Sequence, residues 1–335
     1  MVAPDPRRLG ANALSEAVAA DRSTSDLPWL LAIIAARPRL AALLGAMSIA
    51  FSGIFYRWSA VSPETGAMYR ALFGLPLLAL VATGEWRRYG PMSGRQRRLA
   101  AIAGVFFAGD LIFWHHAIEA VGAGLATVLA NLQVIVVGLV AWVLLGERPS
   151  RSVLGALPIV LLGVVLISGV LGTDAYGANP ALGVVLGLGT AVFYAGYLLV
   201  IRRVGRDLRR PAGPVTVATA ATALTAAGVG GVFGTLDVTP GPASLVWLAL
   251  LGITAQFGGS LLIAVSLPRL PAVLTSIILL SQPVVTVGLA MVLLGEAPSP
   301  QQLLGVALVI GGIALATVPL DKLRASLGRA RAPAA

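Results

Sequence analysis

The residues best suited to chemistry in this chain are polar side chains set inside long apolar stretches. Asp110 lies in "AGDLIFWHHA", Gln133 in "NLQVIVV" and Gln282 in "LSQPVV". A carboxylate can take up a proton or bind a cation, and an amide can both donate and accept hydrogen bonds. Polar groups are costly in apolar surroundings, so these positions indicate a task of their own. The three residues are therefore candidates for a binding site or for proton transfer.

The stretches that carry these residues have the length of membrane-spanning helices. Hydrophobic residues make up 57% of the 335-residue chain and charged residues 11%, whereas soluble domains carry about 25% charged residues. A helix crosses ~30 Å of hydrocarbon with ~20 residues at ~1.5 Å each. The sequence therefore predicts an all-α integral membrane protein with ten transmembrane helices, near residues 40–56, 64–83, 99–118, 122–144, 153–171, 180–201, 212–235, 243–267, 271–294 and 302–319.

The positions of the charges predict how these helices are oriented. With ten spans and a cytoplasmic N-terminus, nearly all basic residues that flank the spans fall on the cytoplasmic side, and this explains the net charge of +10 without a nucleic-acid partner. We expect both termini in the cytoplasm and the protein in the inner (plasma) membrane. The basic segments are 87–98, 148–151, 202–210, Arg269 and 322–331, and the opposite loops carry Glu119, Asp174 and Asp237, with Arg57 as their one basic residue.

A nearly identical ending occurs twice, as "VLLGERPS" up to Ser150 and "VLLGEAPS" up to Ser299. Aligned without gaps, residues 125–150 and 274–299 are identical at eleven of 26 positions. This identity indicates an internal duplication. Each half holds five predicted spans, and a unit with an odd number of crossings must sit inverted when it is repeated in tandem. The sequence therefore predicts two inverted five-helix repeats.

The repeated ending also predicts how one helix stops and the next begins. The glycine lets the chain leave the first helix, and Ser150 or Ser299 can cap the second. After Ser299, Gln302 has the spacing of a capping box. Glu147 and Glu296 stand at helix C-termini, where the dipole disfavours a negative charge, so we expect each to have a hydrogen-bonding partner.

Ten spans in two halves, "GE" at the ends of spans four and nine, and an arginine in span two at "MYRALFG" resemble the drug/metabolite transporter superfamily, specifically the EamA family. The resemblance covers about 41–319 and implies transport of amino acids, other metabolites or drugs, without fixing the substrate. The resemblance implies EamA repeats over 40–171 and 180–319 with an external linker over 172–179. The composition and charge of the two ends predict a mostly disordered cytoplasmic N-terminal segment over 1–39 and a basic cytoplasmic tail over 320–335.

Depth along the helices brings the first candidates together. Asp110, Gln133 and Gln282 each lie ~16 Å from one end of a predicted span, which is the middle of the membrane. Transporters built from inverted repeats bind substrate at this level, so the two glutamines, with Asn131 nearby, are predicted to bind substrate. Pro283 supports this prediction because it frees a backbone carbonyl one turn earlier. The alternative is that the amides only tie helices together.

Aromatic residues could form a wall of the same site. Trp114 is four residues from Asp110 and shares its helix face. Phe51 and Tyr194, in spans one and six, are further candidates for substrate binding. The alternative for each is core packing or contact with lipid.

Three more ionisable residues are candidates. Arg70, ~9 Å into span two, could bind a substrate carboxylate or pair structurally with Asp110, and the arginine shared by the family favours the structural role slightly. His115 and His116 diverge to either side of the face that carries Asp110. With Asp110 they are the candidates for proton coupling, although a histidine can equally be satisfied by a neighbouring carbonyl.

Together with the resemblance, these residues predict a secondary transporter that exports a small metabolite, such as an amino acid or a related amphipathic compound, by alternating access, with Asp110 as a candidate proton carrier. The alternative is an efflux transporter for drugs or toxicants. A channel, a non-transporting receptor and an intramembrane enzyme are less favoured, because neither a filter motif nor a clustered nucleophile and base occurs.

We expect a small-molecule substrate and the lipid bilayer as partners, with a homodimer left open. No cofactor, metal site or catalytic residue is predicted. The chain has no cysteine and only two histidines, and it lacks the GxxxxGK[ST] pattern of an ATP-binding loop.

Overall fold

The computed structural model describes residues 29–317, with gaps at 147–149, 173, 205–208, 267–268 and 271. These residues form helices and loops and contain no strand. Among them the all-helical membrane fold is confirmed, because eight helical stretches are long and apolar enough to cross a membrane. They are α3–α4 (Pro38–Ala50, Ser52–Ser59), α5 (Pro63–Tyr89), α6 (Gly94–Val121), α7–α8 (Ala123–Ala130, Gln133–Leu145), α10 (Pro180–Val204), α11 (Ala212–Phe233), α12–η1–α13 (Pro242–Leu251, Gly252–Gly259, Ser260–Ser266) and α15 (Pro300–Thr317).

Two predicted spans correspond to shorter apolar stretches. These are α9 (Arg151–Ile167) and residues 277–293 of α14 (Ala272–Leu293). The count of ten crossings depends on these two helices. A short helix, α2 (Trp29–Ala36), precedes the first span, while residues 1–28 and the predicted tail over 320–335 lie outside the described residues.

The repeated ending forms the joint that its sequence predicts. Gly146 (φ 69°) and Gly295 (φ 65°) both adopt the left-handed conformation that ends a helix. The Ser150 hydroxyl accepts a hydrogen bond from the start of α9. At the second copy, Ser299 and Gln302 exchange two hydrogen bonds, of 3.0 and 3.2 Å, so the capping box is confirmed. The same joint is needed twice because each repeat contains one.

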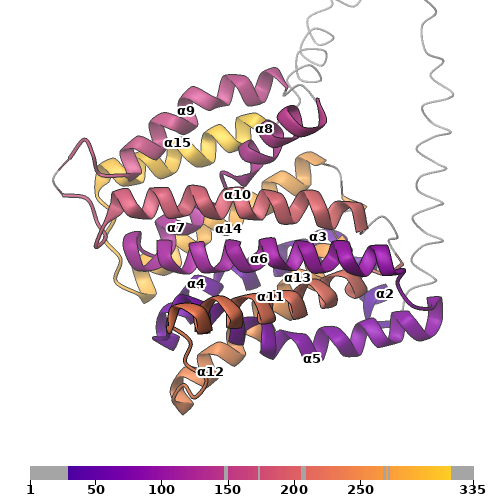
Figure 1. Cartoon of the computed structure of the whole chain (residues 1–335). Coiled ribbons are helices and arrows are strands. Elements are labelled where there is room, and N and C mark those ends of the chain that lie inside the picture. Colours follow the sequence, from indigo (N-terminus) through magenta and orange to yellow (C-terminus); the bar gives the residue numbers. More distant parts are fainter. Residues whose placement is uncertain are drawn as a thin grey trace, which may run out of the picture.

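The two halves pack against each other throughout the bundle. α5 packs on α11, α7 on α14 and α9 on α15. α6 packs on α10, and the pair that corresponds to it by the repeat, α12–η1–α13 and α3–α4, packs in the same way. Figure 1 shows α9, α15, α10, α6, α11 and α5 as roughly parallel rods from top to bottom. The α5–α6 connection lies at the right and the α9–α10 linker at the left, so 87–93 and 172–179 are at opposite ends of the bundle.

Two buried carboxylates join the halves at these opposite ends. Glu296, after α14, accepts hydrogen bonds of 2.6 and 3.1 Å from the first two backbone N–H groups of α7. Glu85, near the end of α5, accepts two hydrogen bonds of 2.8 Å from the first two backbone N–H groups of α11. Helix N-termini carry unpaired N–H groups and a positive dipole end, so a carboxylate is a suitable cap. The partner expected for Glu296 is therefore found, although burial raises the pKa of this carboxyl group. Glu147 lies outside the described residues.

The sidedness of the bundle can be tested by labelling single cysteines, because the chain has none of its own. Ala178 in the α9–α10 linker and Arg97 near the start of α6 are both exposed. We expect a membrane-impermeant maleimide to label Ala178→Cys in intact cells, and to label Arg97→Cys only after permeabilisation, as the positive-inside rule requires. The unchanged chain is the control. The reverse labelling pattern would contradict the predicted orientation.

Candidate functional site

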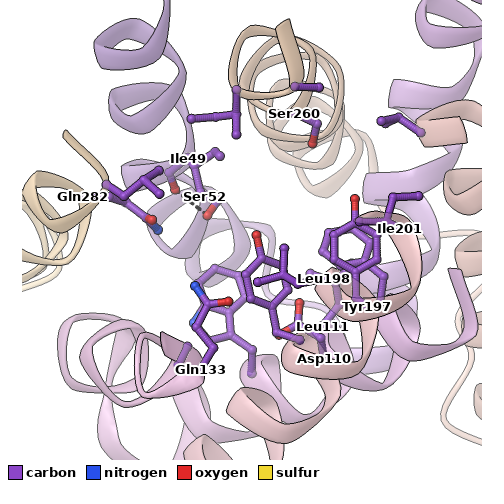
Figure 2. A pocket seen from close by; sticks show the side chains of 18 of the residues that line it. Ile49, Ser52, Asp110, Leu111, Gln133, Tyr197, Leu198, Ile201, Ser260 and Gln282 are labelled. Atoms are coloured by element: carbon purple, nitrogen blue, oxygen red, sulfur yellow. Dashed lines mark hydrogen bonds between the residues drawn. The ribbon is translucent and has the colours of Figure 1, made fainter. Parts of the chain in front are cut away.

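A cavity of about 460 Å³ lies between the two halves, within the ~300–1,000 Å³ typical of small-molecule sites. Its walls come from α3, α4, α5, α6, α7, α8, α10, α11, α13 and α14, and therefore from both repeats. Figure 2 shows polar side chains from several helices around this space, among them Ser52, Asp110, Gln133, Ser260 and Gln282. The cavity therefore lies between the two predicted repeats, where the sequence predicts a binding site.

Irregular backbone surrounds this cavity. The first span changes from α3 to α4 at Phe51, and the fourth from α7 to α8 at 131–132. In the eighth span η1 is a π-helix, and in α14 Pro283 cannot donate a hydrogen bond to the carbonyl of Leu279, a cavity residue. Irregular backbone is tolerated at membrane depth where it lines a cavity, and π-helices are frequent at functional sites.

The cavity contains most of the residues predicted for the site. It is lined by all three residues placed at the midplane and by four of the others, while two histidines and one phenylalanine lie elsewhere. The lining residues are Arg70, Asp110, Trp114, Asn131, Gln133, Tyr194 and Gln282; those outside are Phe51, His115 and His116.

Gln133 and Gln282 lie at the edge of the cavity in Figure 2. Neither side-chain amide hydrogen-bonds to another described residue, and Oε1 of Gln133 is buried without a partner. An amide that tied two helices together would have such a partner. The third amide, Asn131, donates to the Thr127 carbonyl of its own helix at 2.8 Å, so it stabilises the end of α7.

Aromatic rings form one wall. Tyr194 stacks on Tyr197 with a centroid distance of 5.5 Å, and Tyr197 contacts Phe107 at 4.8 Å. The guanidinium carbon of Arg70 lies 5.8 Å from the Phe107 ring and 5.9 Å from the Trp114 ring. This wall offers apolar surface and holds the arginine over two rings. Tyr197 was missed from the sequence, although its spacing of three from Tyr194 in "FYAGY" places both on one helix face.

Arg70 and Asp110 line the same cavity and form no salt bridge with each other, so the structural pairing considered from the sequence stays a prediction. Arg70 instead donates from Nε to Oε1 of Gln256 at 3.2 Å. Asp110 makes no hydrogen bond with a described residue. The site therefore presents a basic and an acidic side chain without a salt bridge between them. Gln256 was also missed, and a glutamine inside the apolar stretch "LGITAQFGGS" was the available signal.

The residues outside the cavity form separate clusters. His115 stacks on Tyr56 at 3.8 Å, and its Nδ1 lies 3.0 Å from the Pro63 carbonyl oxygen. His116 Nε2 lies 3.1 Å from Glu64 Oε1. This group sits where α4, α5 and α6 meet, beside the predicted outer loops. Phe51 stacks on Phe55 along its own span, at 5.9 Å.

The cavity reaches the surface at the end of the bundle that carries the basic loops. Ile201 and the exposed Arg202 line it there, together with Pro211 before α11. Toward the other end, the fully buried side chains of Ile118 and Leu125 belong to the main hydrophobic core. A small molecule would therefore enter from the basic end.

Replacing either cavity glutamine tests whether it binds substrate. We expect Gln133→Ala and Gln282→Ala each to weaken substrate binding about two- to tenfold, because one hydrogen bond contributes about 0.5–1.5 kcal/mol. The midpoint of thermal unfolding in detergent should stay near that of the unchanged protein. Thr222→Val is the matched control, since that hydroxyl bonds the carbonyls of Gly104 and Ala218 away from the cavity. Normal transport with lowered thermal stability in both glutamine variants would instead favour helix tying.

Comparison with known proteins supports the same architecture. The sequence model of the EamA-like transporter family matches residues 37–169 and 181–318. No functionally curated protein matches the chain. Among 25 matching chains of solved structures, one described only as "Crystal structure of protein" is 24% identical, with a TM-score of 0.56, covering 83% of this chain and 98% of its own; that likeness concerns the fold alone. Because the family match extends over most of the sequence in two consecutive parts, the chain belongs to the EamA-like transporter family.

Proposed function

We propose that this protein is a secondary transporter that exports a small zwitterionic metabolite, such as an amino acid, by alternating access. The observation that carries the proposal is a cavity between the two repeats in which Arg70 and Asp110 are both present without a salt bridge between them. An arginine fork suits a carboxylate, and an aspartate suits an ammonium group. A molecule that carries both groups would satisfy both charges at once.

The rest of the cavity suits the remainder of such a molecule. The amides of Gln133 and Gln282 can adapt as donors or acceptors, because neither has a partner among the described residues. The aromatic wall of Phe107, Tyr194 and Tyr197 offers apolar surface to an amphipathic side chain. Burying the charged groups of a substrate in the middle of a membrane would be costly without polar or oppositely charged side chains beside them.

The membrane arrangement of the proposal has ten crossings in two inverted repeats, with both termini in the cytoplasm and the protein in the plasma membrane. It counts α9 and α14 as the two further crossings, since α9 packs on α15 and α14 on α7 within the bundle. The positive-inside rule places the open end of the cavity toward the cytoplasm. Substrate would load there and leave after the halves rock to open the other end, which is the direction of export.

Efflux of an organic cation is the second candidate, favoured by the aromatic wall next to Asp110. Such walls bind cations over ring faces. Arg70 argues against this candidate, because a second positive charge in the same cavity would repel the substrate. The two candidates therefore differ in their need for a substrate carboxylate.

Flux measurements in proteoliposomes with the purified protein distinguish these candidates. We expect at least one of the common amino acids to be transported, and its methyl ester and its deaminated analogue to compete poorly. Arg70→Gln should lower the apparent affinity for the amino acid by at least about tenfold, the scale of one lost charge-assisted contact. Arg97→Gln, on the exposed surface, is the control. Transport of tetraphenylphosphonium without transport of any amino acid would establish the cation candidate instead.

Proton coupling through Asp110 is part of the same proposal. A carboxylate in the middle of the membrane that lacks a paired cation can take up and release a proton as the cavity opens to each side. We expect Asp110→Asn to abolish uphill transport driven by a pH gradient and to spare exchange of substrate for substrate. Glu119→Gln, at a side chain that is 44% exposed near the outer loops, is the control. An Asp110→Asn protein that still responds to a pH gradient would rule out the proton role.

A further inference from the structure

Gln256 is the one buried amide in contact with Arg70 among the described residues, and both ends of its side chain are engaged. Its Oε1 accepts from Arg70 Nε at 3.2 Å, and its Nε2 donates to the Thr219 hydroxyl at 2.8 Å. Gln256 is 1% exposed and does not line the cavity, whereas Arg70 does. The Gln256 amide therefore bonds Arg70 from outside the cavity lining.

The backbone of η1 around Gln256 approaches α5 closely. A Cβ on Gly252 would lie 2.8 Å from the Arg70 carbonyl oxygen, and one on Gly74 would lie 2.7 Å from Gln256 Cγ. Both contacts are too short for any residue but glycine, so η1 and α5 touch at this level. The π-helical stretch Gly252–Gly259 carries Gln256 into this contact. This local geometry gives the amide a fixed position relative to Arg70.

A fixed position matters because Arg70 and Asp110 carry opposite charges in the same cavity. Opposite charges attract strongly where water is scarce, and an arginine side chain is long and flexible. Without a restraint, the guanidinium would turn onto the carboxylate and neutralise it. The restraints in the structure are the bond to Gln256 and the contacts with the rings of Phe107 and Trp114.

We infer that Gln256 is a positioning residue that keeps the Arg70 guanidinium apart from Asp110, so that both charges remain available to a substrate with two opposite charges. The inference rests on the proposed function for the identity of the substrate, but the position of Arg70 can be tested without any substrate. A neutral amide is suited to the task. It accepts a hydrogen bond from Nε and leaves the positive charge of the guanidinium uncompensated.

A double-mutant cycle on thermal unfolding of the full-length protein tests the inference directly. The four proteins are the unchanged chain, Gln256→Met, Asp110→Asn and the double variant. In the unchanged background, Asp110→Asn removes an unpaired charge, so we expect the unfolding midpoint to stay or to rise. In the Gln256→Met background it removes a newly formed Arg70–Asp110 pair, so we expect the midpoint to fall. Equal effects of Asp110→Asn in both backgrounds would overturn the inference.

Two further variants exclude a merely structural role. Gln256→Glu keeps an acceptor for Arg70 Nε and adds a negative charge, so Asp110→Asn should raise the unfolding midpoint in this background; a fall as large as with Gln256→Met would contradict the inference. If Gln256→Met does not fold, Thr219→Val replaces it in the cycle, because it removes the far anchor of the amide and should produce a smaller coupling of the same sign. An additive cycle with Thr219→Val would also count against the inference.

Binding of L-leucine and of its deaminated analogue 4-methylpentanoate supplies a second readout by calorimetry. Gln256→Met should weaken binding of L-leucine by at least about tenfold, and adding Asp110→Asn should raise binding of 4-methylpentanoate above that of Gln256→Met alone, because Arg70 is released. No such gain, while the unchanged protein binds L-leucine, would overturn the inference. If the unchanged protein binds neither probe, the proposed substrate class is in doubt, and the unfolding cycle alone decides the role of Gln256.

Discussion

The structure depends on one constraint, which is that backbone polar groups inside a membrane must find partners within the protein. Regular helices meet this constraint without help, so each departure from regularity needs a reason. Here the departures are at Phe51, at 131–132, in η1 and at Pro283, and all of them adjoin the cavity between the halves. The same breaks that would be costly against lipid lie beside polar side chains that line this cavity. The location of the site follows from where the helices stop being regular.

The features that depend on position along a helix could be predicted from the sequence. The rise per residue is constant, so counting residues from the end of a span brought Asp110, Gln133 and Gln282 to one level, and the cavity contains all three. The joints at Gly146 and Gly295 were predictable because capping chemistry is local and involves only a few neighbouring residues. Charge and repeat parity predict the orientation in the same one-dimensional way, and that orientation stays a prediction.

The features that depend on rotation about a helix axis could not be predicted. His115 directly follows Trp114 in the chain, yet only the tryptophan lines the cavity, because adjacent residues point about 100° apart. Phe51 was expected to form part of the wall and contacts Phe55 instead, since the direction of its ring depends on the break between α3 and α4. The partner of Arg70 was not predictable either. It is Gln256, from a π-helical stretch whose extra residue per turn changes the register of everything around it.

The exchange of helix caps between the halves has a consequence for how such a chain can arise. Glu296 completes α7 and Glu85 completes α11, so each repeat supplies the carboxylate that the other lacks. A single half, made on its own, would leave the first amides of one helix without the carboxylate that accepts from them here. Its simplest remedy would be a second copy of itself in the opposite orientation. Fusion of two such copies into one chain makes this mutual completion independent of protein concentration, and afterwards each half can change only as far as the other continues to cap it.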